Sequence, residues 1–210
     1  MQHNQPSESP TRARPSPATG GLPKLHLGCG RRFIPGFIHV DLDDFPHIDY
    51  RHDVRSLPMF PDNTVKLIYA CHVLEYFDRV EVTDVLREWR RVLAPGGTLR
   101  VAVPDFAALV RVYQTYGQLD RLVGPLYGRI AVNTPQGPAV AYHHTTYDYD
   151  SLRLALEGAA FENVRRYDWR ATEHSHVDDF SQAYVPHMDK DHGLLISLNA
   201  EADKPLAAGD

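Results

Sequence analysis

The chain has 210 residues, of which 43% are hydrophobic and 23% are charged. This balance is typical of a globular protein and excludes a fibrous or wholly disordered chain. The net charge of -5 argues against a general nucleic-acid-binding protein, which would usually present a basic face. The apolar runs are too short to span a membrane, and no secretory signal core follows the N-terminus. The two cysteines, Cys29 and Cys71, fit a cytoplasmic protein without disulfides.

Residues 1–23 are rich in Pro, Ser, Thr, Gln and Gly and hold almost no large apolar side chains, so we expect a disordered N-terminal tail. Order should begin near Lys24. Residues 24–210 show no internal repeat and no sign of a second domain, which predicts one domain over this range.

The elements follow from apolar patterns and turn residues. Leu25 to Leu27 form an apolar run before Gly28-Cys29-Gly30, a pattern typical of a buried strand that ends in a tight turn. Similar patterns predict strands at 37–42, 65–70, 98–103, 164–169 and 194–199, and a short strand or strand exit at 53–57. Helices are predicted at 79–93, 106–116 and 151–158, and Pro95-Gly96-Gly97 should stop the first. Residues 117–149 are expected to include an insertion over the active site.

Strands alternate with helices through residue 169. This order predicts an α/β fold with a mostly parallel sheet and helices on both faces. Ligands of such sheets bind at the C-terminal edges of the strands, near the point where the strand order reverses. The chemistry of this protein is therefore expected where the first strands end.

The turn after the first strand is the main candidate ligand site. Gly28 and Gly30 let the backbone approach a ligand closely, although two glycines alone also fit a plain tight turn. Asp41 ends the second strand, where a carboxylate can accept hydrogen bonds from both hydroxyls of a ribose. Asp53 lies at the expected end of the third strand and could accept from an adenine amino group; its alternative role is a turn or helix cap.

An NAD site would use the same acid, but the pattern differs from a dinucleotide fingerprint. The third glycine of Gly-x-Gly-x-x-Gly is replaced by Phe33. Asp41 comes only 13 positions after Gly28 rather than about 20. Pro35-Gly36 also leaves room for only a very short first crossover helix, which makes a poor pyrophosphate site.

The segments LHLGCG, HVDL, HDVRSLP, IYACHVLEY and LREWRRVLAPGGTLRVAVPD together resemble class I S-adenosylmethionine (SAM)-dependent methyltransferases. The resemblance spans roughly residues 24–116, with a looser fit to the end. It implies a Rossmann-like, seven-stranded sheet whose last strand is antiparallel. The LGCG, IPGF and VDL segments with a curtailed first helix further resemble small bacterial methyltransferases associated with sugars and polysaccharides, including the mycobacterial sugar O-methyltransferases of methylmannose polysaccharide synthesis.

The resemblance also implies SAM as cofactor and assigns residues to it. Gly28 and Gly30 would contact its methionine portion, Asp41 its ribose and Asp53 its adenine. The neighbouring positions that would complete this pocket are Cys29, Leu42, Val54, Cys71 and His72.

Transfer to a hydroxyl benefits from a base, and histidine has a suitable pKa. His144, in AYHHTTYDYD, is the first candidate, with His143 as a positioning or metal-binding neighbour; a solvent-exposed pair is the alternative. His72 could contact the methionine portion or act as the base. Glu75 could bind substrate hydroxyls or cap the next helix.

Further candidates for substrate binding lie at the end of the fifth strand and beyond it. Asp105 could orient a sugar hydroxyl or a histidine, but its alternative role as an N-cap of the 106–116 helix is slightly favoured. Tyr142, Tyr147 and Tyr149 could stack on a sugar or simply pack. The run that contains His174, His176, Asp178, Asp179, His187, Asp189, Asp191 and His192 could hold Mg²⁺ or Zn²⁺, but it lacks recognisable ligand spacing and also fits a solvated loop or lid.

These patterns favour an O-methyltransferase acting on a sugar or another small hydroxylated acceptor, without nucleic acid or a membrane span, and with a homodimer left open. N-methylation of a small amine and a SAM-binding protein without transfer activity are the alternatives. The metal requirement stays open at this point.

Overall fold

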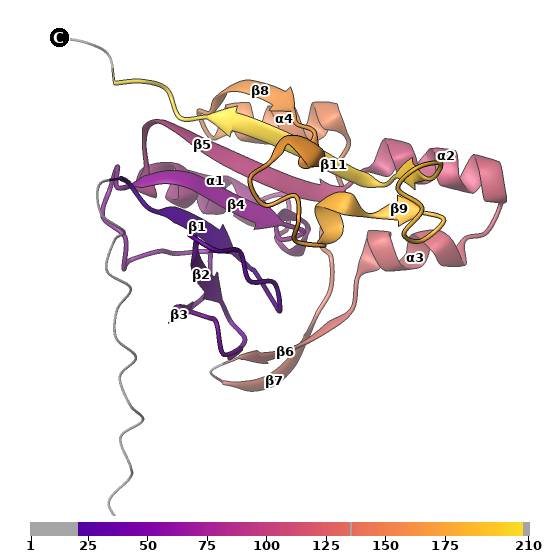
Figure 1. Cartoon of the computed structure of the whole chain (residues 1–210), viewed down its shortest axis with the longest axis horizontal. Coiled ribbons are helices and arrows are strands. Elements are labelled where there is room, and N and C mark those ends of the chain that lie inside the picture. Colours follow the sequence, from indigo (N-terminus) through magenta and orange to yellow (C-terminus); the bar gives the residue numbers. More distant parts are fainter. Residues whose placement is uncertain (1–20, 135, 208–210) are drawn as a thin grey trace, which may run out of the picture.

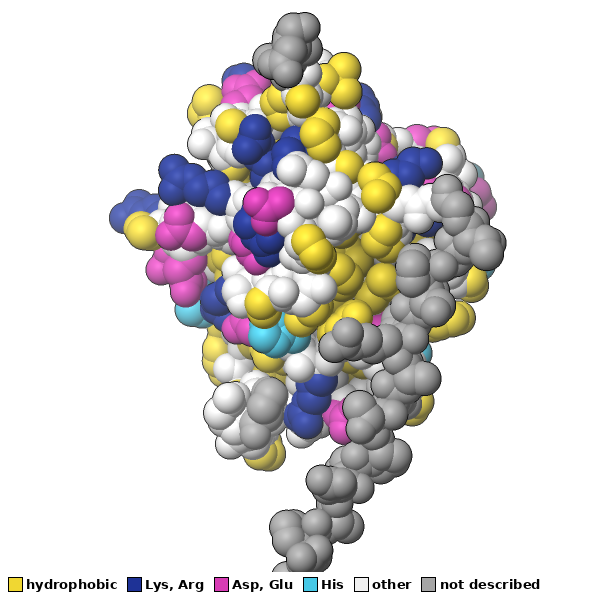
Figure 2. Space-filling model, turned by 90° about the vertical axis from the view of Figure 1, so that its left-hand side faces the viewer, with side chains coloured by type: hydrophobic (Ala, Val, Ile, Leu, Met, Phe, Trp, Pro, Cys, Tyr) yellow, Lys and Arg dark blue, Asp and Glu magenta, His cyan; other side chains and the backbone are white. Residues whose placement is uncertain are grey.

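The computed structural model describes residues 21–134 and 136–207. The tail predicted at residues 1–23 therefore lies almost entirely outside the described residues. No helix in the described ranges has both the length and the apolar character needed to cross a membrane. Figure 2 shows the face at the N-terminal ends of the parallel strands, where acidic and basic side chains are interspersed.

A seven-stranded sheet forms the centre of the fold (Figure 1). Its strand order is β3-β2-β1-β4-β5-β11-β8, and β11 is antiparallel to both of its neighbours, as predicted. The order reverses beside β1, so the ends of β1 and β4 face a crevice. The strands are β1 Lys24–Leu27, β2 Ile38–Asp41, β3 Tyr50–Arg51, β4 Val65–Cys71, β5 Leu93–Pro104, β8 Glu162–Arg166 and β11 Ser197–Asp203.

Helices α1 (Glu81–Val92) and α4 (Tyr149–Gly158) pack on one face of this sheet. Alternate strand residues such as Leu25, Leu27 and Ile68 point to this face and are fully buried against them. Trp89 of α1 is buried here, and its indole N–H donates to the carbonyl of Val54 at 2.8 Å. This bond ties the loop after β3 to the main core.

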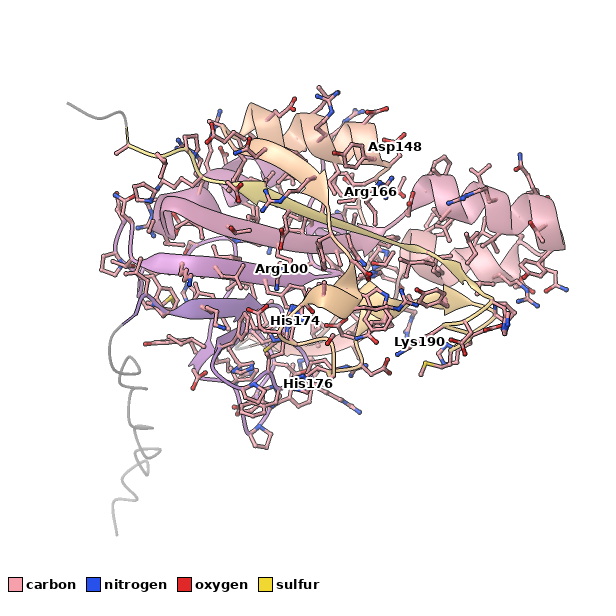
Figure 3. All side chains as sticks on the ribbon, turned by 45° about the horizontal axis from the view of Figure 1, so that its top comes forward. Arg100, Asp148, Arg166, His174, His176 and Lys190 are labelled. Atoms are coloured by element: carbon pink, nitrogen blue, oxygen red, sulfur yellow. The ribbon has the colours of Figure 1, made fainter. Side chains whose placement is uncertain are left out.

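The opposite face is covered by loop segments and two 3-10 helices, η2 (Trp169–Ala171) and η3 (Phe180–Gln182). Tyr69 of β4 is fully buried there, and its ring stacks on His26 at 5.2 Å and on His174 at 4.2 Å. Arg100 lies on the same face, where it pairs with Glu173. Figure 3 shows Arg100 and His174 together on this side of the sheet. Strand residues alternate between an aliphatic core and this polar aromatic layer.

The third strand lies earlier than predicted. It is Tyr50–Arg51, whereas residues 53–57 form turns. The Asp53 carboxylate accepts the backbone N–H of Arg55 at 2.9 Å, and the Asp53 carbonyl accepts from Ser56 at 3.3 Å. A side chain that satisfies the backbone in this way competes with strand pairing. The weaker form of the prediction, a strand exit at this point, is the correct one.

The bounds of other strands and helices also differ from the predicted ones, each because of local structure. The predicted strand at 194–199 divides into β10 (Leu194–Leu195), which pairs with β9 (Tyr184–Val185), and β11. The division occurs at Ile196, whose N–H donates to the carbonyl of Ala183 at 2.9 Å. The strand predicted at 164–169 is β8, and Trp169 instead begins η2. Helix α1 ends at Val92, before Pro95, because residues 93–97 already belong to β5.

The segment expected to lie over the active site follows helix α2 (Phe106–Tyr116), whose bounds match the prediction. It contains helix α3 (Asp120–Tyr127) and a hairpin of β6 (Ile130–Thr134) and β7 (Gly137–Ala141). Arg51 of β3 donates to the carbonyl of Asn133 at 2.6 Å. The hairpin therefore reaches from α3 back to the edge of the sheet (Figure 1).

Candidate active site

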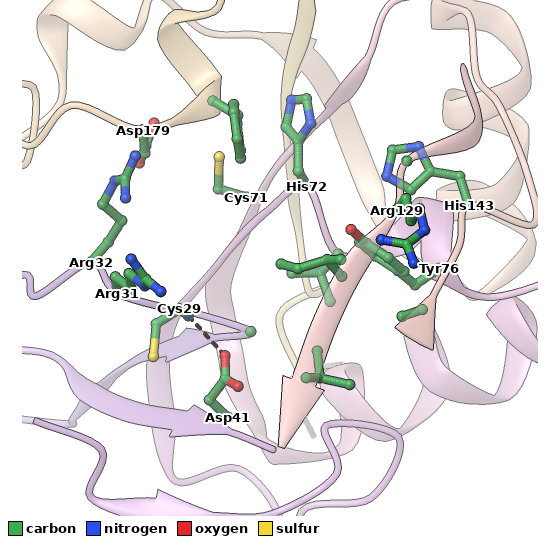
Figure 4. Close-up of a pocket in the computed structure, with 18 of the residues that line it drawn as sticks. Cys29, Arg31, Arg32, Asp41, Cys71, His72, Tyr76, Arg129, His143 and Asp179 are labelled. Carbon is green, nitrogen blue, oxygen red and sulfur yellow. Dashed lines mark hydrogen bonds between the residues drawn. The ribbon is translucent and has the colours of Figure 1, made fainter. Parts of the chain in front are cut away.

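A cavity of about 1420 Å³ opens at the C-terminal edge of β1, β2 and β4. The loops after these strands form its floor, while α3, the β6–β7 hairpin and η3 form the other walls. Figure 4 shows Asp41 and Cys29 on one side and His143, Tyr76 and Arg129 on another. The volume exceeds that of a typical small-ligand pocket of about 300–1,000 Å³, so two ligands fit together.

The glycine turn after β1 forms the floor beside β2. Gly28 has φ +60°, and a Cβ at this position would lie 2.5 Å from Cγ2 of Val73, so only glycine fits. Gly30 has φ +52°, but a Cβ there would meet no atom within 4 Å. The space above Gly30 belongs to the cavity, which leaves its backbone accessible to a ligand.

Asp41 holds this turn in place. One carboxylate oxygen accepts the N–H of Gly30 at 2.8 Å, and the other accepts the N–H of Asp43 at 2.8 Å. The carboxylate is only partly buried and lines the cavity together with Leu42. Each oxygen retains a further lone pair, so Asp41 can accept two more hydrogen bonds from a ligand.

Asp53 and Val54 line the cavity farther along the same edge. The Asp53 carboxylate pairs with Arg55 at 2.9 Å and is 40% exposed, so it is already engaged and well hydrated. The Val54 N–H has no acceptor among the described residues, whereas its carbonyl accepts from Trp89. The Asp53 carboxylate and the Val54 N–H therefore offer one acceptor and one donor to a planar ligand.

Both cysteines line the cavity as free thiols. Burial, followed by the charge of Asp41, raises the pKa of Cys29. Burial, followed by the charge of Asp179, also raises the pKa of Cys71 well above its ordinary value. The two thiols therefore stay protonated, which argues against a cysteine nucleophile.

His72, directly after β4, has φ +54°, a strained conformation for a residue with a side chain. Its Nδ1 lies 3.2 Å from Oε1 of Glu75, and its Nε2 lies 3.3 Å from Oγ of Ser197. Burial, with a smaller contribution from His143, lowers the pKa of His72 to about 3. The imidazole is therefore neutral at physiological pH and is a weak base.

Glu75 lies behind the cavity wall rather than in it. Its side chain is fully buried in the 3-10 helix η1 (Leu74–Tyr76), and burial raises its pKa to about 8. Nε2 of His143 lies 3.9 Å from its Oε1. Although His72 is also close, neither carboxyl oxygen has a well-oriented hydrogen-bond partner among the described residues. The carboxyl group is therefore held mainly as the neutral acid at pH 7.

The adjacent histidines of the predicted pair face different surroundings. The His143 side chain is only 7% exposed, its Nδ1 lies 3.0 Å from the carbonyl of Pro125, and its ring meets Tyr76 edge-on at 4.8 Å. Burial lowers the pKa of His143. His144 is exposed and lines the cavity, and its ring has no hydrogen-bond partner among the described residues. Its backbone N–H donates to the carbonyl of Glu75 at 2.7 Å, which fixes the backbone position.

Three further predicted substrate residues, in addition to Glu75, do not line the cavity. Asp105 caps α2 by accepting the N–H groups of Ala107 and Ala108. Tyr147 is 4% exposed and packs in the main core. His174 lies on the polar aromatic face of the sheet, stacked on Tyr69. Among the other two tyrosines considered, Tyr142 lines the cavity, whereas Tyr149 packs against the core.

The polar run after His174 contributes Asp178, Asp179 and His187 to the cavity wall. Asp179 accepts from the hydroxyl of Tyr69 at 2.7 Å. Within residues 21–134 and 136–207, no three His, Cys, Asp or Glu side chains gather closely enough to hold a metal ion. Asp179 also caps η3 by accepting the N–H of Ser181, and Asp178 pairs with Lys190 at 3.1 Å.

The sequence interpretation did not single out several cavity residues. Tyr76 follows Glu75 directly, and Arg129 lies inside the 117–149 segment that was expected near the site. Arg31 follows the glycine turn, and Phe180 begins η3. Their positions depend on how α3, the hairpin and η3 fold back over the sheet, and no local sequence pattern specifies that arrangement.

Comparisons with known proteins agree with this geometry. Residues 37–101 match the Methyltransf_11 family model, a methyltransferase domain. This match includes β2, β4, α1 and most of β5. No curated protein matches the chain significantly in sequence.

Solved structures share the fold at low sequence identity. A SAM-dependent methyltransferase from Archaeoglobus fulgidus aligns with a TM-score of 0.53 at 14% identity, covering 88% of this chain and 87% of that one. A chain from the Haloferax volcanii complex of the Trm112 methyltransferase activator with a methyltransferase aligns at 0.50 and 15% identity, covering 90% and 85%. The fold is that of class I methyltransferases, and together with the family match it supports a SAM-dependent methyltransferase.

Proposed function

We propose that this protein transfers a methyl group from SAM to a hydroxyl of a sugar or oligosaccharide, with a histidine as general base. The observation that carries the cofactor assignment is the pairing of an open glycine turn with the Asp41 carboxylate at the sheet edge. The roles of individual residues are proposed from the burial and the free hydrogen-bonding groups of the side chains that line the cavity.

The residues present fit SAM. Asp41 has two free acceptor positions for a ribose diol, and Asp53 with the Val54 N–H suits an adenine edge. Gly30 leaves open space for the methionine portion, with Cys29, Cys71 and His72 along the same wall. When bound, SAM supplies a methyl group activated by its sulfonium.

His144 is the base that the geometry favours. Its exposed ring lines the cavity without a hydrogen-bond partner in the described part of the chain, so a lone pair is available. His72 and His143 are more buried, their ring nitrogens lie near protein groups, and burial lowers their pKa values. His144 would accept the proton of the acceptor hydroxyl as its oxygen takes the methyl group, and the methyl–sulfur bond of bound SAM would break to leave neutral S-adenosylhomocysteine. His72 and His143 then serve to shape and position this end of the site.

A saccharide fits the remaining part of the cavity. Tyr142 and Phe180 line it and are 47% and 59% exposed, so their rings are available to stack on a sugar face. Asn133 adds an amide group that can bind a hydroxyl, since only its Nδ2 has a side-chain partner, the carboxylate of Asp43. The free thiols at Cys29 and Cys71 fit a cytoplasmic enzyme.

The alternative is transfer to the nitrogen of a small amine. An uncharged amine already presents a lone pair, so it has little need of a base. Substitution of His144 by alanine should therefore abolish transfer to a hydroxyl but reduce transfer to an amine only slightly. A protein that binds SAM without any transfer would show cofactor affinity and no methylated product.

The test is incubation of SAM-loaded protein with a library of mono- and disaccharides and small amines, with methylated products detected by mass spectrometry. A methylated saccharide that disappears with His144→Ala, while calorimetric SAM affinity is retained, supports the proposal. Methylation restricted to amines, or full activity of the variant on a saccharide, contradicts the acceptor or the base respectively. A parallel reaction with chelator shows whether Mg²⁺ is needed.

A further inference from the structure

The far end of the cavity contains an arginine that the transfer chemistry does not use. Arg129 follows the C-cap residue of α3, Gly128, lines the cavity and is exposed. In the described ranges it forms no ion pair and no hydrogen bond, whereas Arg55 pairs with Asp53 and Arg51 holds the hairpin. Figure 4 shows Arg129 on the side of Tyr76 and His143, away from Asp41 and Asp179.

The backbone around Arg129 is firmly fixed. The N–H of Gly128 donates to the carbonyl of Gly124 at 2.8 Å, and the N–H of His143 donates to the carbonyl of Tyr127 at 2.8 Å. The His143 ring packs so closely on Gly128 that a Cβ there would lie 2.5 Å from Nε2. The start of the Arg129 side chain is therefore set relative to His143 by close packing rather than by a free loop.

Among the described residues, no ionised carboxylate pairs with the positive charge of Arg129. His143 and His72 are neutral because burial lowers their pKa values, and Glu75, with a pKa raised to about 8, is fully buried behind them. Tyr76 is half-buried, and its hydroxyl has no hydrogen-bond partner among the described residues. The Asp41 carboxylate lies on the other side of the cavity from Arg129 (Figure 4), and the proposed cofactor contacts use it together with Asp53.

We propose that Arg129, on the side of the cavity where Tyr76 also lies, binds an oxyanion of the acceptor, so that the natural acceptor is an acidic saccharide. A guanidinium binds carboxylate or phosphate through two parallel hydrogen bonds and would place the reacting hydroxyl by a rigid contact. This inference rests on the proposed transfer to a saccharide and specifies its substrate class. The oxyanion is a carboxylate or a phosphate.

The first test compares matched acceptors: neutral sugars, the corresponding uronic acids and the corresponding sugar phosphates. Wild-type protein and the control Arg111→Gln, an exposed arginine of α2 outside the cavity, should methylate one acidic series with at least tenfold higher kcat/KM. Arg129→Gln should lower kcat/KM for that series at least tenfold more than for the neutral sugars, and Arg129→Lys should restore part of it. The series affected identifies carboxylate or phosphate. A preference for neutral sugars, or an equal loss on all series, overturns the inference while leaving the proposed function intact.

The second test needs no turnover. Calorimetry in the presence of S-adenosylhomocysteine measures binding of glucuronate and glucose 6-phosphate to wild type, Arg129→Gln and Arg111→Gln. An affinity that falls at least tenfold only in Arg129→Gln supports the anion site even if no library sugar is methylated. Equal binding by all three proteins, or none, overturns it. Failure of the wild-type protein to bind S-adenosylhomocysteine would instead contradict the proposed function.

Discussion

Replacement of Asp41 by alanine removes the carboxylate that connects the glycine turn to the cofactor site. In the structure its two oxygens accept from Gly30 and Asp43, and each has one further position for a ribose hydroxyl. A hydrogen bond to a charged group contributes about 1.5–3 kcal/mol. Loss of two such bonds to the ribose amounts to roughly 3–6 kcal/mol, or about a 10²- to 10⁴-fold rise in Kd, since each tenfold change is about 1.4 kcal/mol.

Isothermal titration calorimetry with SAM and with S-adenosylhomocysteine measures this change directly. Asp44→Ala is the matched control, because Asp44 is exposed and does not line the cavity. Thermal melting should show that Asp41→Ala remains folded, since the core behind β2 is unaffected. Asp41→Ala binding SAM within about threefold of the wild-type affinity would refute the assignment of Asp41 to the ribose.

Three further predictions concern stability. Gly28→Ala should destabilise the fold by about 2–5 kcal/mol through overpacking on Val73 and a left-handed backbone, and Val73→Ala should recover part of the loss in chemical denaturation; equal stability of the single and double variants would exclude the steric cause. Glu75→Gln should melt at a higher temperature than wild type at pH 9 but not at pH 5. Burial raises the pKa of Glu75 from 4.5 to about 8, so the wild-type protein loses stability as the pH rises through that range. A difference in melting temperature that does not depend on pH would contradict this. Since burial lowers the pKa values of His26 and His174, the unfolded chain binds protons more readily below pH 6.5, so the melting temperature should fall from pH 6.5 to 5, and less steeply in His26→Phe; an unchanged slope would argue against His26.

The sequence predicts the centre of this fold well because its signals are local. Short apolar runs identify the buried strands β1, β2 and β4, and Gly28 and Gly30 mark the turn that ends β1. Once the sheet is taken as parallel, Asp41 must lie at the same edge as that turn. The structure places its carboxylate on the Gly30 N–H, a contact between residues only eleven positions apart.

The acceptor end could not be predicted, since long-range packing determines it. His143 and His144 are adjacent, but the His143 ring packs against Gly128, Pro125 and Tyr76, whereas the His144 side chain is exposed. Asp105 and Tyr147 were expected near the substrate but lie outside the cavity, in a helix cap and in the core. Whether such a carboxylate or aromatic ring binds substrate, caps a helix or packs in the core depends on contacts with residues distant in sequence.

A crystal structure of the wild-type protein with S-adenosylhomocysteine tests the central claim most directly. Its nucleoside should lie across the ends of β1 and β2, with both ribose hydroxyls on the carboxylate of Asp41 and the adenine beside Asp53. A complex in which the nucleoside occupies another surface, or crystals that show no bound nucleoside at saturating concentration, would contradict the methyltransferase assignment.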